Sequence, residues 1–222
     1  MPPGSTKSSS NLLDKLHGGY VHPRRARVLR DHLAPLIPRD ACVLDVGCGD
    51  GLIASLILQQ RVDVSISGVD VLVRPDTLVP VEEFDGQKLP YADKSFDAIL
   101  FVDVLHHSYD PVGLLGEAAR VARQFIIIKD HLRDGFLAAS TLRFMDYIGN
   151  ARHDVALPYN YLACSEWFKA FSDLGLTINN WRTDLGLYSK PFNWFFDRQL
   201  HFVAQLDVSN QFHQSVNASV SD

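Results

Sequence analysis

Cysteine is scarce in this sequence. The 222 residues include three cysteines, an odd number, scattered at positions 42, 48 and 164. Such a set argues against a disulfide framework and against a clustered zinc site, and it suits a reducing compartment. We therefore expect a cytoplasmic protein without structural metal.

Long apolar runs and an excess of positive charge are also missing. The apolar runs at 98–102 and 125–129 are far shorter than the roughly 18 residues that a membrane helix needs. The N-terminus has no apolar segment typical of a secretory signal. The net charge is −5, so no basic field attracts nucleic acid or anionic lipid. These absences predict no membrane insertion and no nucleic-acid partner, and they favour a small-molecule substrate.

The two ends of the chain are polar and differ from the rest. Residues 1–11 are rich in Pro, Gly and Ser, and residues 207–222 are mostly polar, so both are expected to be disordered tails. The remainder, 12–206, predicts a single domain.

Strand and helix patterns alternate through this domain. Apolar residues recur at helical spacing from Pro23 to Pro38, after the glycines at 52–57, and from Pro111 to Val121. A further helix is expected to start with Ser165 as its cap and to end at Gly175. Strands are expected at 42–46, 64–70, 78–84, 96–103, 124–130, 176–182 and 201–206. This alternation predicts an α/β fold, with a mostly parallel sheet covered by helices on both faces.

The stretch VLDVGCGDG at 43–51 carries the first functional signal. A glycine turn between a strand and a helix is typical of a pyrophosphate site, of an S-adenosylmethionine site, or simply of a tight turn. Here the spacing is G-x-G-x-G, not the G-x-G-x-x-G of dinucleotide sites. Asp45 and Asp50 bracket the turn with negative charge, which disfavours a pyrophosphate and favours a cationic cofactor.

Further matches follow in the order that a nucleoside site needs. Asp70 ends the second expected strand about twenty residues after the glycines, where a carboxylate can accept from ribose hydroxyls. The segment 84–107, FDGQKLPYADKSFDAILFVDVLHH, then adds an Asp-Gly turn, a Leu-Pro pair and an acidic strand exit. Together with VLDVGCGDG it closely resembles the class I S-adenosylmethionine-dependent methyltransferases, in particular the broad group that includes ubiquinone- and menaquinone-biosynthesis C-methyltransferases.

The resemblance, which covers about residues 40–130, implies a Rossmann-like sheet of seven strands whose last strand is antiparallel. It implies that the glycine turn holds the methionine end of the cofactor, that Asp70 and Val71 hold the ribose and flank the adenine, and that Asp85 accepts from the adenine amino group. The full set of implied cofactor contacts is Asp45, Gly47, Cys48, Gly49, Asp70, Val71, Asp85, Gly86, Gln87, Val102 and Asp103, with Tyr20 and Arg25 as N-terminal residues that close over the cofactor.

Three histidines are candidates for catalysis. His106 and His107 follow the fourth strand, and His131 ends the fifth, so each is expected on the edge where ligands bind. One of the adjacent pair can act as a general base or a substrate contact; packing or turn capping is almost as plausible. A metal on Asp103 and His107 lacks a third ligand, and we predict no metal.

Two aromatic segments, 131–163 and 186–198, interrupt the regular pattern. The first is expected to form a substrate lid, although its aromatic residues can equally cover a core of its own. An aromatic or apolar acceptor is favoured. The sequence thus predicts a methyltransferase that converts S-adenosylmethionine to S-adenosylhomocysteine. The alternatives are a nicotinamide-dependent oxidoreductase and a non-catalytic S-adenosylmethionine-binding protein.

Overall fold

A sheet of seven strands forms the centre of the computed structural model, which describes residues 22–150, 158–190, 193–197 and 199–209. The strands are β1 (Cys42–Val46), β2 (Ser65–Asp70), β3 (Val81–Glu83), β4 (Phe96–Val102), β5 (Ala122–His131), β6 (Thr177–Arg182) and β7 (His201–Asp207). Their order across the sheet is β3-β2-β1-β4-β5-β7-β6. β7 pairs antiparallel with both of its neighbours, and the other pairings are parallel. The predicted fold class is confirmed.

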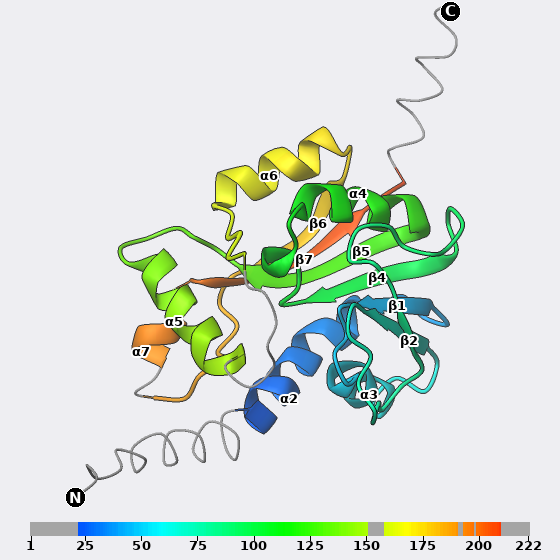
Figure 1. Ribbon diagram of the computed structural model, residues 1–222, viewed down its shortest axis with the longest axis horizontal. Coiled ribbons are helices and arrows are strands. Elements are labelled where there is room, and N and C mark those ends of the chain that lie inside the picture. Colours follow the sequence, from blue (N-terminus) through cyan, green and yellow to red (C-terminus); the bar gives the residue numbers. More distant parts are fainter. Residues whose placement is uncertain (1–21, 151–157, 191–192, 198, 210–222) are drawn as a thin grey trace, which may run out of the picture.

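Helices cover both faces of this sheet (Figure 1). On one face, α2 (His22–Leu33), the short η2 (Ala34–Leu36) and α3 (Leu52–Leu58) pack through residues such as Leu29, Leu33 and Ile57. On the other face, α4 (Pro111–Val121) and α6 (Cys164–Asp173) contribute Leu115 and Trp167 to a second cluster. Burial on both sides explains why β1, β4 and β5 read as continuous apolar runs.

The strand predictions hold closely, whereas one helix cap was wrong. β1 has the predicted bounds, β3 is shorter than expected, and β7 extends one residue further, to Asp207. The N-cap of α6 is Ala163, not Ser165. Ala163 has no polar side chain, so the first amides of α6 are satisfied otherwise: Glu166 accepts from the Ala163 amide at 2.6 Å and Asp134 accepts from the Cys164 amide at 2.7 Å.

The first aromatic segment forms a small layer at one end of the sheet. The helix α5 (Ala138–Asn150) of this segment lies beyond the carboxyl ends of the parallel strands (Figure 1). The four-residue α7 (Asn193–Phe196), from the second aromatic segment, lies at the same end. Leu142 packs with Tyr161 and Leu200 in a cluster separate from the two main ones. The expectation that aromatic residues serve a local core is therefore met in part. Of the expected tails at 1–11 and 207–222, residues 1–11 and 210–222 lie outside the described residues, whereas Asp207 ends β7 and Val208 is buried.

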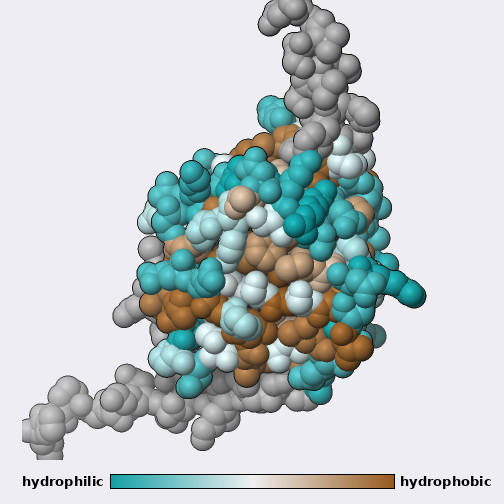
Figure 2. All heavy atoms as spheres, turned by 90° about the vertical axis from the view of Figure 1, so that its right-hand side faces the viewer, coloured by the Kyte–Doolittle hydropathy of each residue, from teal (hydrophilic) through white to brown (hydrophobic). Residues whose placement is uncertain are grey.

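The outer surface of the described residues is mixed in character. At the end of the molecule that lies on the right in Figure 1, apolar residues are interspersed with hydrophilic ones (Figure 2). Among the described residues, no helix is long and apolar enough to span a membrane.

Candidate functional site

The glycine turn joins β1 to α3 and is fixed by β2. The Gly47 amide donates to the Val69 carbonyl at 2.8 Å, and the Gly49 amide donates to the Asp70 carboxylate at 2.8 Å. Gly47 has a φ of +69°, and a Cβ at this position would lie 2.6 Å from a methyl group of Val104. Only glycine fits such a backbone without strain. Asp70 ends β2, where the sequence places it, and the structure adds that its carboxylate holds the turn in shape.

The electrostatics of the turn differ from the sequence prediction. Asp45 is buried, and burial followed by the nearby charge of Asp70 raises its pKa to about 8, so its carboxyl group is largely protonated at neutral pH. Asp50 caps the Leu52 amide and lies 3.7 Å from the Arg74 guanidinium, which offsets its charge. The negative charge expected from Asp45 is thus largely removed by burial, whereas Asp50 lies beside a cation, and sequence shows neither the burial nor the partner.

The Cys48 side chain packs against the sheet, and its implied contact with the cofactor stays a prediction. A Cβ on Gly68 of β2 would collide with the Cys48 sulfur, so the thiol fills the space that this glycine leaves. Burial raises the pKa of the thiol, which excludes a reactive thiolate. The side chain of Cys48 therefore packs the turn against the sheet.

The residues implied for the adenine lie together on the next loops. A Cβ on Gly86 would lie 3.0 Å from a Val71 methyl group, so these two positions are in contact. The Asp85 carboxylate accepts from the Gln87 and Lys88 amides at 2.8 and 2.7 Å, and these bonds lower its pKa. Val71 is half exposed, with Leu72 beside it. An ionised carboxylate next to an uncovered apolar surface fits the edge and face of an adenine ring.

Asp103 lies at the centre of a charged network at the end of β4. Its carboxylate accepts hydrogen bonds from Arg25 of α2 and from the fully buried Lys129 of β5. Burial acts to raise the pKa of Asp103, but the charges of Arg25 and Lys129 hold it well below its usual range. Val102, the preceding residue, pairs in register with Lys129. Tyr20 lies outside the described residues, so its predicted cofactor contact stays a prediction.

A second buried pair joins β5 to the segment η3 (Leu105–His107), where two of the predicted histidines lie. The Asp130 carboxylate lies 2.6 Å from Nδ1 of His106 and also accepts from the Leu105 amide at 3.0 Å. Burial acts to raise the pKa of Asp130, but its contacts with His106 and His131 hold that pKa below its usual range. Because Asp130 is ionised, Nδ1 of His106 donates to its carboxylate, and this bond orients the imidazole ring.

His131 lies beside this pair in a different electrostatic environment. Its Nδ1 is 3.3 Å from Asp130 and 3.6 Å from Asp103. Burial and the charge of Lys129 lower its pKa to about 4, so it is neutral at pH 7 and a weak base. His201 of β7 donates from Nε2 to the Phe196 carbonyl at 3.0 Å, which leaves Nδ1 to accept from Lys129 at 3.4 Å. Of the three predicted histidines, His106 is buried, His131 is buried and His107 is partly exposed.

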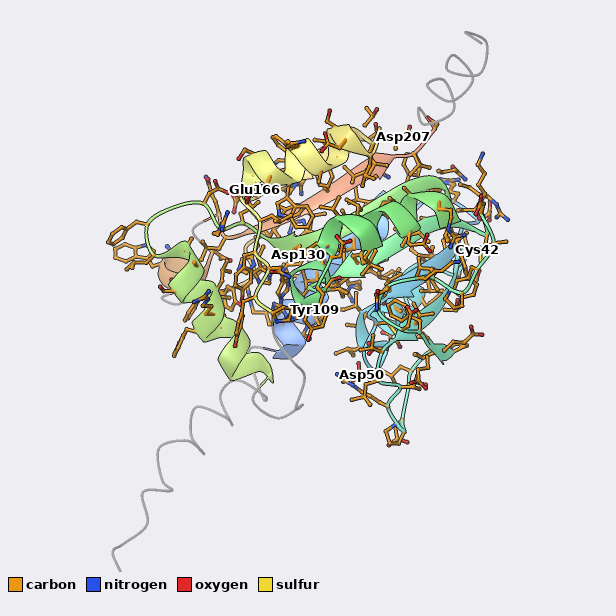
Figure 3. The ribbon with its side chains drawn as sticks, turned by 45° about the horizontal axis from the view of Figure 1, so that its top comes forward. Cys42, Asp50, Tyr109, Asp130, Glu166 and Asp207 are labelled. Atoms are coloured by element: carbon orange, nitrogen blue, oxygen red, sulfur yellow. The ribbon has the colours of Figure 1, made fainter. Side chains whose placement is uncertain are left out.

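These side chains lie at one end of the sheet. Figure 3 labels Cys42 and Asp207 at the amino end of the parallel strands, and Asp130, Tyr109 and Glu166 toward the carboxyl end. Sequence reasoning missed Lys129, Asp130 and His201. A signal was available for two of them, because Lys129 and Asp130 end an otherwise apolar run, FIIIKD, and charged residues in a buried strand mark a site.

The histidine cluster has a geometry that a metal ion could use. His106, Asp130 and His131 offer ligand atoms within 4.8 Å of one another. However, the two carboxylates of Asp103 and Asp130 already balance the cations Arg25 and Lys129, so a divalent ion would add two uncompensated charges to a buried region. The donor set therefore favours a hydrogen-bonded network, and the absence of a metal stays a prediction.

Comparison with known proteins gives a consistent result. A family profile described as "Methyltransferase domain" matches residues 20–179. The chain is 31% identical over 140 residues to 27-O-demethylrifamycin SV methyltransferase of Amycolatopsis mediterranei, covering 51% of each chain. It is 24% identical over 115 residues to the ubiquinone biosynthesis O-methyltransferase of Photobacterium profundum, covering 46% of this chain and 47% of the relative. The chain spans about half the length of these curated relatives.

The fold is shared with solved structures at low sequence identity. An S-adenosylmethionine-dependent methyltransferase from Mesorhizobium loti has a TM-score of 0.60 and 15% identity, over 80% of this chain and 96% of that chain. A methyltransferase of Haloferax volcanii, solved in complex with the Trm112 activator, has a TM-score of 0.61 and 14% identity, over 92% of this chain and 97% of that chain.

Proposed function

Because this chain belongs to the methyltransferase domain family, within the class I S-adenosylmethionine-dependent methyltransferases, we propose that it methylates a small-molecule acceptor. The observation that carries the proposal is the bond from the Gly49 amide to Asp70, which holds beside the glycine turn a carboxylate that would bind the ribose. The nicotinamide alternative loses its support, since the family and the G-x-G-x-G spacing both disfavour it.

The chain's own residues divide the cofactor between two regions. Asp70 would hold the ribose hydroxyls, and Val71, Asp85, Gly86 and Gln87 would form the adenine side. When bound, S-adenosylmethionine supplies a methyl group on a positively charged sulfur. A cation close to Asp45 would lower the raised pKa of this buried carboxyl group, so that it becomes ionised when the site is filled.

Arg25 and Asp103 would serve the amino-acid end of the cofactor. They are paired with each other, and Lys129 holds the other carboxylate oxygen. A zwitterion presents one carboxylate and one ammonium group, and the Arg25–Asp103 pair offers the two complementary charges. The buried Lys129 keeps Asp103 in place during this exchange of partners.

The His106–Asp130 pair favours an acceptor that must lose a proton. Asp130 fixes His106 with its lone pair on Nε2, and this nitrogen would accept the proton of an acceptor hydroxyl as the oxygen attacks the methyl group. His131, with a pKa of about 4, is the weaker candidate for a base. Two relatives are named for methylation at oxygen or for an O-demethylated substrate, which is consistent with this choice.

Two measurements test the proposal. S-adenosylhomocysteine should raise the melting temperature by mass action, and Asp70→Ala should abolish the shift while Asp207→Ala, at the other end of the sheet, should retain it. Labelled cofactor offered with phenols, alcohols, amines and carboxylates should label the hydroxyl-bearing pool. Absence of any shift at millimolar ligand would overturn the cofactor assignment. A shift without methyl transfer to any pool would favour the non-catalytic alternative.

A further inference from the structure

A cavity opens on the surface beside the His106–Asp130 pair. It has a volume of about 300 Å³ and lies between the start of α4, the segment 159–162 and the start of α6. The lining of this cavity includes Tyr109, Tyr159, Asn160, Tyr161, Arg133 and Glu166. This volume is at the lower end of the range for small-molecule sites, which is about 300–1,000 Å³.

Tyr161, which lines the cavity, also contacts His106. The ring of Tyr161 stacks on His106 with centroids 5.3 Å apart and an interplanar angle of 20°. The Asn160 amide donates to the His106 carbonyl at 3.0 Å, and the Asn160 side chain donates to the Ser108 carbonyl at 2.7 Å. A group seated in the cavity would therefore lie one ring thickness from His106.

The charges in the cavity cancel. Arg133 donates to Glu166 at 2.8 Å, and both side chains are about half exposed at the rim. The same Glu166 oxygen accepts from the Ala163 amide at 2.6 Å, which fixes the carboxylate in position. Because Glu166 is paired with Arg133, its negative charge offsets the attraction of Arg133 for an anionic ligand. In the same way, the positive charge of Arg133 offsets the attraction of Glu166 for a cationic ligand.

The remaining lining consists of three tyrosines together with Pro111, Leu162 and Asn160. Tyr109 is 83% exposed, so its ring is available to a ligand, and Tyr159 lies 6.2 Å from Tyr161 between ring centroids. Tyrosine rings provide flat apolar surface, and their hydroxyl groups provide hydrogen bonds. Such a lining suits a flat ring that carries hydroxyl groups and no charge.

We propose that this cavity binds the non-reacting part of the acceptor, and that this part is an uncharged, hydroxylated ring system. The inference rests on the proposed function, since it assigns the cavity to the same acceptor. The ring would lie against Tyr161 and extend toward Tyr109.

Three phenols whose para substituents carry different charges test the proposal. These probes are 4-hydroxybenzyl alcohol (neutral), 4-hydroxybenzoate (anionic) and tyramine (cationic), each added to the whole chain at neutral pH with and without S-adenosylhomocysteine. Saturation-transfer NMR reports which probe binds. We expect binding of the neutral alcohol and a dissociation constant at least about tenfold weaker for the two charged probes. Equal binding of all three, or no binding of the alcohol at millimolar concentration, would overturn the proposal.

Two variants locate the binding site. Tyr109→Ala removes an exposed ring and should weaken binding of the alcohol about tenfold. Phe168→Ala is the matched control, because it removes a ring from the side of α6 that packs on Trp181, and it should leave binding unchanged. An unchanged dissociation constant in Tyr109→Ala would place the ligand elsewhere and overturn the proposal.

A charge substitution provides a gain of binding. Glu166→Gln keeps an oxygen for the Ala163 amide and releases the charge of Arg133, so 4-hydroxybenzoate should now bind more tightly than to the unmodified chain. Failure of this gain would contradict the electrostatic argument. Binding of S-adenosylhomocysteine, measured separately by melting temperature, tells the two failures apart. A chain that binds it but not the alcohol overturns only the cavity assignment. A chain that binds the alcohol but not S-adenosylhomocysteine overturns the proposed function, and with it the assignment of the cavity to an acceptor.

Discussion

Nδ1 of His106 and the carboxylate of Asp130 lie 2.6 Å apart, and both side chains are buried. The two residues belong to neighbouring elements, since His106 follows β4 and Asp130 lies near the end of β5. The pair fixes the tautomer of the histidine, and the main consequences for activity follow from it.

Asp130→Asn is expected to lower kcat strongly. An asparagine carbonyl can still accept from His106, but it does not stabilise the positive charge that His106 gains with a proton, so a loss within the range of about 10²- to 10⁴-fold for general base catalysis is expected. Initial rates with labelled cofactor measure the effect, and the affinity for S-adenosylhomocysteine should stay the same. A loss of cofactor affinity equal to the loss of kcat would instead indicate a structural role, as would an unchanged pH profile.

Asp45→Asn is expected to flatten the dependence of stability on pH. The pKa of Asp45 is raised from 3.8 to about 8, so the folded protein binds a proton here that the unfolded chain releases. The contribution is fully present below about pH 4 and is lost as pH rises toward pH 8, at up to about 1.4 kcal/mol per pH unit. Denaturant unfolding of the variant and the unmodified chain at several pH values gives this difference. The same variant should bind S-adenosylmethionine more weakly, because asparagine cannot ionise beside a cation.

Lys129→Met is expected to destabilise the fold. Lys129 is fully buried and donates to Asp103, so its removal leaves a mostly buried carboxylate with one fewer cation, at a cost of about 3–5 kcal/mol. Combining it with Asp103→Asn should recover part of this loss, since the unpaired charge is then gone. If the two losses simply add in chemical denaturation, the ion pair is not the source of the effect.

Gly47→Ala is expected to lower both stability and cofactor affinity. The left-handed φ of +69° costs about 1–2 kcal/mol for a residue with a Cβ, and the collision with Val104 adds to it. Val104→Ala in the same chain should relieve the collision and leave the backbone cost. Thermal unfolding of the single and double variants separates the two contributions, and identical melting temperatures for both would contradict the steric argument.

The sequence by itself determined the sheet, the position of the glycine turn and the family. Strand length, alternation of strands with helices and G-x-G-x-G spacing are local properties, and local backbone preferences carry them without knowledge of distant contacts. For this reason the predicted bounds of β1 and β2 agree with the structure within one residue, and Asp70 is the last residue of β2 in both.

The tertiary structure decided which charges are present and which side chains face one another. Asp45 is protonated because it is buried, and Asp50 is offset by Arg74, a residue 24 positions further on. Asp134 accepts from the first amide of α6, and Asp103 is paired with Lys129 on the neighbouring strand and with Arg25. The pKa of a carboxyl group depends on its burial and on charges within a few ångströms. These quantities are fixed by residues far apart in the chain, so only the folded structure shows that Asp130 contacts both His106 and His131.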